Sequence, residues 1–439
     1  MTNRDILAWI FLSAWVCVLM QGALRKWAFP SVNVIYLIQD VPLLAAYFFA
    51  VWKGLVWQGK LAWLCTVIAI VLSIETLVQV IFIDLSARTA VVGLHHYIFY
   101  LPILFIAPVS FNAKHRLRFV RWNLLFIIPM SVLAALQSRA PKGAWINKTS
   151  AGDETGFGIA DDTVRATGTF NFTLTYSIWC GFAVGLVLGE WLLPPERRAF
   201  KSKILLLVCT MSALLATLVS GSRTAVMLAA LGFVGGFASV VITRNVRLIV
   251  RFGLVLVLLP ILTAIAYVVV PKSFNAVIER FSGEEYQEDM LKRIDHMIVG
   301  FVSVPEFSYL GKGIGYGIPA ANPAAGAATG ILLSEHETIR TVQELGSFIG
   351  PALVLLRYAM SFVIISFGFK ALLLKRNHSF PHAVPLAFSA VPIFMIGELV
   401  RSAPVISSQI FFVIALILSA VLFRDEPLTA GPVSMPKMR

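Results

Sequence analysis

The chain has 439 residues, of which 58% are hydrophobic and 13% are charged, and its mean hydropathy is +0.82. A soluble domain carries about 25% charged residues, so this composition excludes an ordinary soluble protein and indicates an integral membrane protein. The net charge of +13 does not indicate nucleic-acid binding, because the lysines and arginines lie in short segments between apolar runs, where positive charge sets membrane topology.

Apolar runs long enough to span a bilayer recur along the chain and predict an all-α integral membrane protein with about twelve transmembrane helices. We expect these spans at 6–23, 33–52, 61–83, 89–111, 119–137, 172–193, 203–221, 224–243, 247–270, 345–374, 383–399 and 403–423. The first run lacks a cleavage site and is expected to be retained as an anchor. The run after Glu344 contains Arg357, so it forms either one long tilted helix or a surface helix followed by a span.

Basic connections between the runs predict the orientation. The densest Lys and Arg clusters lie at 114–121, 197–203, 244–251 and 375–376. All of them fall on the cytoplasmic side when the chain is threaded from a cytoplasmic N-terminus, and the C-terminal tail then lies there too. The same threading places the 138–171 loop, the 220–223 turn and the 271–344 loop outside.

The long polar loop divides the chain into a transmembrane bundle at 1–270, the loop at 271–344, transmembrane helices at 345–423 and a tail at 424–439. The loop holds cations, acids and a histidine between apolar spans, and we expect short helices in it. A polytopic protein would place chemistry at one membrane face in such a loop. The alternating glycines at 311–317 lack the spacing of a phosphate-binding loop and predict a tight turn.

Arginines at the outer face are candidates for binding an anion. Arg223 follows Ser-Gly-Ser at the end of a span, so a tight turn would present its guanidinium at the lipid–water boundary. The alternative is a cation that anchors a helix end. Arg293 borders the apolar face of an amphipathic stretch at 286–301, where the alternative is a solvated flank. Arg165 ends the first outer loop, and an ordinary boundary cation is its alternative.

His336 lies between Glu335 and Glu337, with Arg340 one helical turn further on. A histidine near neutral pH can accept a proton from a hydroxyl, and a neighbouring carboxylate fixes its tautomer. The alternative is an exposed loop histidine. Asp40, Glu75, Glu190 and Glu398 lie within spans, where we expect them to pair or form a relay. His95 and His96 lie near the outer end of the fourth span, where we expect them to line a cleft.

Three outward-facing pieces resemble the bacterial O-antigen polymerase and O-antigen ligase superfamily. The first is Ser-Gly-Ser-Arg-Thr-Ala at 220–225, and the second is Arg293 followed by Leu-Gly-Lys-Gly-Ile-Gly at 310–315. The third is His336 followed by Glu-Leu-Gly-Ser-Phe-Ile-Gly at 344–350. The start Gly-Ala-Leu-Arg-Lys-Trp at 22–27 resembles one branch of these proteins, and the layout of spans extends the resemblance over most of the chain.

The resemblance implies a GT-C-like fold and glycosyl transfer, without metal or cofactor, from an undecaprenyl-diphosphate-linked oligosaccharide at the periplasmic face of the inner membrane. It implies that Arg223 and Arg293 face the diphosphate and that His336 acts at the acceptor hydroxyl. We expect further substrate contacts from Arg165, Glu337, Arg340 and Glu344. The expected partners are membrane lipid and other polysaccharide-assembly proteins, such as a flippase or a chain-length regulator, and not nucleic acid.

Alternatives remain within and outside this superfamily. Ligases tend to show His-x-Asn, whereas His336 is followed by Glu337 and Thr338, which favours a polymerase over a ligase. A transporter or flippase with as many spans would show related halves and a buried charge path near the bilayer midplane. The two halves show no repeat and the charge gathers in an outer loop, so we expect an enzyme.

Overall fold

The computed structural model describes residues 2–30, 32–148, 164–282, 295, 298–302, 308–318, 336–374, 380–396 and 403–422. Every regular element in these ranges is a helix. Nine of the described helices are long and apolar enough to cross a membrane, or ten if the bent pair α4–α5 is one span. The protein is therefore an all-α, multi-pass membrane protein, as its composition predicts.

The helices follow the predicted apolar runs closely. Their bounds are α1 (Asn3–Ala23), continued by the π-helix η1 (Leu24–Ala28), then η2 (Asn33–Leu37), α2 (Asp40–Trp52), α3 (Lys60–Phe82), α4 (Ala87–Ile98), α5 (Ile103–Ser110), α6 (Ala113–Arg139), η3 (Trp145–Asn147), α7 (Thr173–Leu192), η4 (Pro195–Arg197), α8 (Lys203–Val219), α9 (Arg223–Thr243), α10 (Val246–Val269), α11 (Pro271–Ser282), α13 (Glu337–Leu373), α14 (Ala383–Ile396) and α15 (Ala403–Leu422). Because α8 and α14 are shorter apolar helices, the count of twelve spans stays a prediction.

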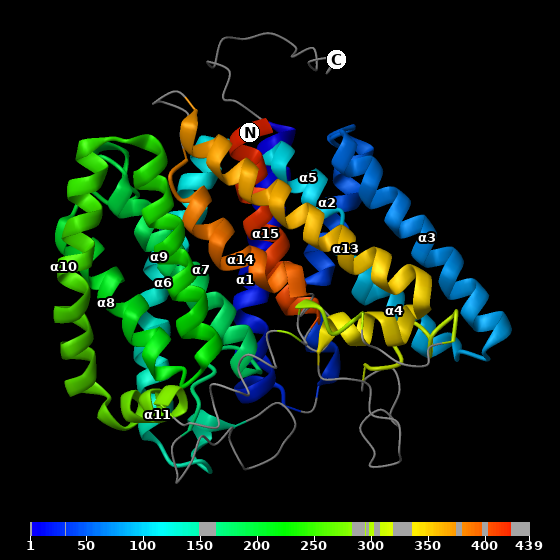
Figure 1. The fold of residues 1–439 in the computed structure, drawn as a ribbon, viewed down its shortest axis with the longest axis horizontal. Coiled ribbons are helices and arrows are strands. Elements are labelled where there is room, and N and C mark those ends of the chain that lie inside the picture. Colours follow the sequence, from blue (N-terminus) through cyan, green and yellow to red (C-terminus); the bar gives the residue numbers. More distant parts are fainter. Residues whose placement is uncertain are drawn as a thin grey trace.

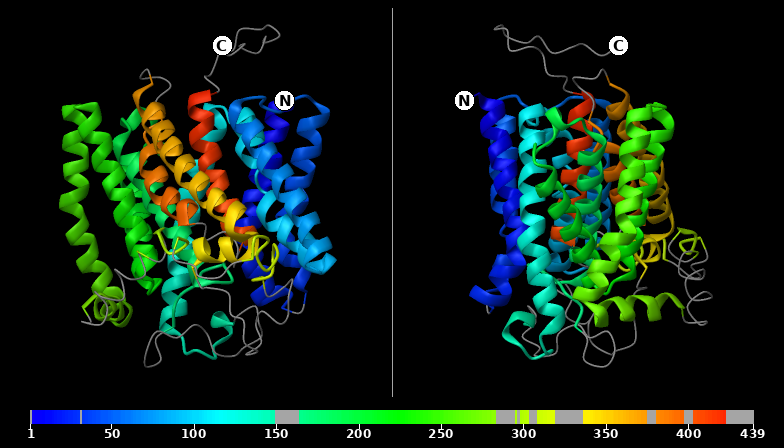
Figure 2. Two further views of the ribbon diagram at one scale, coloured as in Figure 1. Left: turned by 45° about the vertical axis from the view of Figure 1, so that its right-hand side comes forward. Right: turned by 90° about the vertical axis from the view of Figure 1, so that its left-hand side faces the viewer.

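The bundle has two unlike ends (Figures 1 and 2). The start of α1, the end of α15 and the connections α5–α6, α7–α8 and α9–α10 lie at one end, and these connections are the basic ones. The other end, here called the loop-rich end, bears α11, which lies across the bundle, and the first turns of α13. This grouping is the one that the threading from the sequence predicts.

Two spans differ from simple straight helices. The run predicted at 89–111 is broken into α4 and α5, which are bent by 41°. Pro102 caps α5, and a proline lacks the N–H that would continue the helical hydrogen bonds. The long α13 is kinked at Gly346, whose φ of 77° and ψ of −176° are not helical. A short segment before the kink lies across the loop-rich end, and one long oblique helix follows it (Figure 1). The structure therefore has both the surface helix and the tilted helix that the sequence offered as alternatives for this run.

The interior of the bundle is built around α7 and α15, whose apolar stretches are almost wholly buried. Helix α7 packs against α9 and α14, and α15 packs against α5 and α13. By contrast, α3 and α10 expose large apolar side chains, among them Trp63, Ile74, Val257 and Val268. A soluble protein rarely exposes such continuous apolar surface, whereas lipid chains cover it without cost.

We predict that the loop-rich end faces away from the cytoplasm, because the basic connections lie at the opposite end. Reporter fusions at Lys142, after α6, should give a signal only from outside the cytoplasm. Fusions at Lys201, between α7 and α8, and at Asn245, between α9 and α10, should give the cytoplasmic signal. A cytoplasmic signal at Lys142 together with an external one at Lys201 would reverse the orientation.

Candidate functional site at the loop-rich end

The first turns of α13 bring several of the predicted site residues together. His336 is the N-cap residue, with φ −84° and ψ 123°, and its side chain makes no capping hydrogen bond to the helix. Glu337 and Arg340 follow it on α13, are both buried and form an ion pair. Thr341 donates its hydroxyl to the Glu337 carbonyl at 2.7 Å. The carboxylate of Glu337 is therefore directed to Arg340, and Glu335 lies outside the described residues.

Glu344 is fully buried and binds the glycine-rich segment at 308–318. Its carboxylate accepts hydrogen bonds from the backbone N–H groups of Gly315 at 3.2 Å and Gly317 at 2.9 Å, and from the Tyr97 hydroxyl at 3.0 Å. Gln79 adds to this junction by donating to the Glu344 carbonyl at 2.9 Å. Glu344 was predicted to bind substrate; the geometry assigns its oxygens to the positioning of this segment, and a direct substrate contact stays a prediction.

The glycine-rich segment follows a path that other residues would not adopt without strain. Gly311, Gly313 and Gly315 have φ values of 67°, 106° and 79°, in the left-handed region that favours glycine. The N–H groups of Lys312 and Gly313 donate to the carbonyls of Gln343 and Glu344, at 2.8 Å and 3.1 Å. The segment is thus a tight turn fastened to the last turn before the kink in α13.

Arg165 and Arg223 come from separate segments, and both lie at the loop-rich end, where the charge of Arg223 acts on Arg165. The serine–glycine–serine stretch before Arg223 forms the tight turn that the sequence predicts, with Gly221 at φ 57° and Ser222 as the N-cap of α9. Burial, and then the positive charge of Arg223, hold the pKa of Arg165 below its usual value. Arg165 also has a buried Nε without a hydrogen-bond partner among the described residues. Two cations whose charges act on each other give this part of the loop-rich end a positive potential suited to an anion.

A buried lysine fixes the segment that follows Arg165. Lys26 is 2% exposed and its Nζ donates to Thr167 Oγ1 at 2.9 Å, to the Gly168 carbonyl at 2.7 Å and to the Phe170 carbonyl at 2.8 Å. Gln137 accepts from the N–H groups of Thr167 at 3.2 Å and Gly168 at 2.8 Å. These bonds hold the backbone two residues beyond Arg165, so Lys26 is a positioning residue for it.

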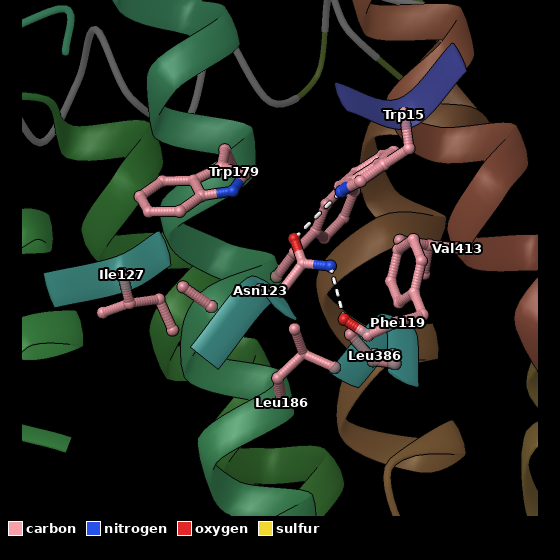
Figure 3. Close-up of a pocket in the computed structure, with 10 residues that line it drawn as sticks. Trp15, Phe119, Asn123, Ile127, Trp179, Leu186, Leu386 and Val413 are labelled. Carbon is pink, nitrogen blue, oxygen red and sulfur yellow. Dashed lines mark hydrogen bonds between the residues drawn. The ribbon is translucent and has the colours of Figure 1, made fainter. Parts of the chain in front are cut away.

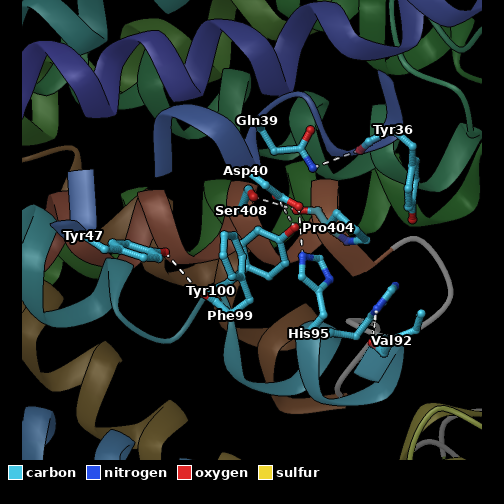
Figure 4. A network of polar contacts seen from close by, with 11 residues as sticks. Tyr36, Gln39, Asp40, Tyr47, Val92, His95, Phe99, Tyr100, Pro404 and Ser408 are labelled. Carbon is cyan, nitrogen blue, oxygen red and sulfur yellow. Dashed lines mark hydrogen bonds and ion pairs between the residues drawn. The ribbon is translucent and has the colours of Figure 1, made fainter. Parts of the chain in front are cut away.

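A second polar network, which the sequence did not group, joins α2 to the broken span (Figure 4). Asp40 accepts a hydrogen bond from the Tyr100 hydroxyl at 2.6 Å, and its other oxygen lies 2.9 Å from His95 Nε2. The rings of His95 and His96 are 5.4 Å apart, and the charge of Arg340 acts on His96. The polar network therefore extends from Asp40 through His95 to His96. The only sequence signal for it is the presence of ionisable residues within spans.

A narrow pocket in the middle of the bundle is a packing feature (Figure 3). Its walls are apolar except for Asn123, which accepts from the Trp15 indole N–H at 3.1 Å and donates to the Phe119 carbonyl at 2.8 Å. Because these polar atoms satisfy one another, the pocket offers no group to a ligand.

The structure thus gathers the predicted site residues into two groups. Arg165 and Arg223 form one, and His336, Glu337, Arg340 and Glu344 share the start of α13. Arg293 lies outside the described residues. Within the parts of the chain that are described, no three His, Cys, Asp or Glu side chains gather closely enough to hold a metal ion. Comparison of the chain with models of protein families and with curated proteins finds no match.

We predict that Gly346→Ala destabilises the protein by roughly 1–3 kcal/mol, because a Cβ there would collide with the Tyr309 carbonyl oxygen and φ is positive. Thermal unfolding in detergent, and proteolysis of the 308–318 segment, should both show the loss. Gly253→Ala in α10 is the control, because its Cβ would meet nothing within 4 Å. Equal behaviour of the two variants would show that the kink at Gly346 is not required.

Proposed function

We propose that this protein is a membrane glycosyltransferase of the O-antigen polymerase type, which joins undecaprenyl-diphosphate-linked oligosaccharide units at the periplasmic face of the bacterial inner membrane. The proposal includes about twelve spans in a GT-C-like arrangement. The single structural observation that supports it is the like-charge interaction between Arg165 and Arg223 at the loop-rich end. The motif resemblances at 220–225, 310–315 and 344–350 supply the reaction class.

The chemistry requires charge stabilisation at the leaving group. As the acceptor oxygen attacks the anomeric carbon, the bond from that carbon to the diphosphate oxygen breaks and the lipid diphosphate leaves as an anion. Fixed guanidinium groups stabilise this charge as it develops and need no reorganisation at that moment. Arg165 and Arg223 suit this role because each planar fork can bind phosphate oxygens in bidentate fashion. Arg293 is the proposed third cation.

The acceptor hydroxyl must lose its proton during the same step, and His336 is the proposed base. Its position at the N-cap of α13 places the imidazole at the end of a rigid helix, beside the buried pair of Glu337 and Arg340. The junction of Glu344 with the glycine-rich segment then fixes the other end of this short first segment of α13. Rigid support of this kind keeps a base within reach of the hydroxyl.

The reaction class is tested by deleting the gene and analysing the surface polysaccharide. A polymerase predicts glycans reduced to single repeat units, whereas a ligase predicts polymer that accumulates on the lipid carrier. Transfer by the purified protein in detergent, where no second compartment exists, would exclude a transporter. Activity that is lost with a chelator and restored by a divalent ion would contradict the metal-independent scheme.

We predict that Arg223→Ala lowers polymer formation by about tenfold to a hundredfold, since it removes charge-assisted hydrogen bonds to the diphosphate. Arg223→Lys should restore only part of the activity, because the ammonium lacks the planar fork. The matched control is Arg247→Ala, at the exposed start of α10 near the opposite end of the bundle. Full activity of Arg223→Ala at normal expression would remove Arg223 from the site.

We predict that His336→Ala lowers polymer formation by about a hundredfold or more, because a general base is lost, while the amount of protein in the membrane is unchanged. The control is His115→Ala, in α6 near the basic end. Wild-type polymer from His336→Ala would assign His336 to an ordinary helix cap.

A further inference from the structure

A cavity between α3, the α4–α5 break, α13, α14 and α15 has a composition that the proposed reaction does not use. Most of its wall is aliphatic or aromatic, and its polar members are His96, Tyr97, Arg357 and Ser407. The apolar members are Ile68, Leu72, Leu101, Leu104, Leu353, Leu356, Met360, Phe394 and Phe411. An apolar cavity with a few convergent polar groups is the usual form of a small-ligand site.

Arg357 gives this cavity a buried positive charge. The side chain lies midway along α13 and is 6% exposed. Its Nη1 donates to Thr341 Oγ1 at 3.3 Å, which uses only one of the five N–H donors of a guanidinium. A cation among apolar side chains is costly unless charged or polar acceptors meet it. The charge of Glu344 acts on Arg357, but the Glu344 carboxylate is bound by the glycine-rich segment and Tyr97, so an anion in the cavity would supply acceptors to the guanidinium.

Ser407 is an independent sign of a ligand. It is 1% exposed, lines the cavity, and its Oγ has no hydrogen-bond partner among the described residues. A serine within a helix commonly donates to the carbonyl four residues earlier, and the neighbouring Ser408 does so, at 2.6 Å from the Pro404 carbonyl (Figure 4). A buried hydroxyl left unbonded is destabilising, so its retention at a cavity wall is explained by an acceptor that occupies the cavity.

The remaining polar groups divide between the cavity and its surroundings. His96 Nδ1 donates to the Val92 carbonyl at 2.8 Å, so the other ring nitrogen is left for other contacts. Tyr97 donates its hydroxyl to Glu344, which ties this wall to the glycine-rich segment. The donors that face the cavity are therefore the guanidinium of Arg357 and the hydroxyl of Ser407.

We propose that this cavity binds the phosphate headgroup of an amphiphile, with Arg357 and Ser407 as donors to the phosphate oxygens and the apolar wall around the start of the hydrocarbon chain. The guanidinium fork matches a phosphate, and the aliphatic residues of α3 and α13 match a chain that enters from the membrane. The site is separate from the Arg165–Arg223 pair. It goes beyond the proposed function, because binding here does not require that the protein transfers sugar.

Binding is measured with the purified full-length protein in detergent micelles, by native mass spectrometry and by the rise in unfolding temperature on addition of ligand. The probe is dodecyl phosphate, compared with dodecanol and with inorganic phosphate. We expect the amphiphile to bind at least about tenfold more tightly than either part alone, since both a charge-assisted bond and apolar burial contribute. Equal binding of dodecanol would leave only an apolar cavity, and equal binding of inorganic phosphate would leave only a free-anion site; either result overturns the proposal.

Adjacent serines on α15 provide the matched variants. Ser407→Ala should weaken dodecyl phosphate binding by about tenfold and leave the unfolding temperature without ligand unchanged or higher, because the lost hydroxyl has no partner. Ser408→Ala should leave binding unchanged, since Ser408 is buried but does not line the cavity. Arg357→Met should abolish binding where the variant folds. Identical affinities in both serine variants would overturn the proposal, and loss of sugar transfer with intact binding would count only against the proposed function.

Discussion

The buried carboxylate of Glu344 is the constraint on which the loop-rich end depends. A carboxylate removed from water is stable only when hydrogen-bond donors surround it, and here they are two backbone N–H groups of the glycine-rich segment and the Tyr97 hydroxyl. Gln79 completes the junction, because its side chain donates to the carbonyls of Leu310 and Glu344 and accepts from the N–H of Ile314 at 2.8 Å. Helices α3, α4 and α13 and the glycine-rich segment are thereby fixed to one another at a single polar junction.

The kink at Gly346 lies two residues after Glu344. It lets the short first segment of α13 cross the end of the bundle instead of continuing into the membrane.

Other buried polar groups also join helices to one another elsewhere in the bundle. In a bilayer the helices gain little from apolar contact, so a few polar bonds and close packing decide which helices adjoin. At the basic end, Glu190 on α7 lies 3.0 Å from His382 Nε2 and accepts from the Ala199 N–H at 2.8 Å. Burial lowers the pKa of Arg198 in the adjoining connection, and its Nε donates to the Glu190 and Leu193 carbonyls. On the other side of the bundle, Asp40 joins α2 to the α4–α5 break. Both groups lie at a helix end or a helix break, where free backbone groups also need partners.

The sequence predicts the helices better than it predicts the site, for a physical reason. The sequence signal for a membrane helix lies within one continuous run of apolar residues that is long enough to cross the bilayer. The observed helices therefore lie where the apolar runs were found. The kink at Gly346 packs against Tyr309, which comes from another segment, and it was not resolved from the sequence. Glu344 was grouped with substrate contacts because it is acidic and near His336, whereas its observed partner Tyr97 is 247 residues away. Arg165 and Arg223 were each singled out, but only the fold shows that the charge of Arg223 acts on Arg165. The roles proposed for them and for His336 remain predictions.

The amino-terminal Gly-Ala-Leu-Arg-Lys-Trp stretch has a structural role that connects it to the same arginine pair. A Cβ on Gly22 would collide with the Thr169 carbonyl oxygen, so the end of α1 and the segment before α7 are in direct backbone contact. Thr169 donates its hydroxyl to the Leu19 carbonyl at 2.6 Å, and Lys26 bonds three oxygens of the same segment. The π-helical turn that continues α1 therefore carries Lys26 into the segment that begins with Arg165. A glycine for close approach and a buried cation for carbonyl oxygens are both needed for this contact, because neither a larger residue nor a neutral one would satisfy it. The backbone that follows Arg165 is thus held in place from the first helix of the chain, so this motif acts on the candidate site through the segment that it binds.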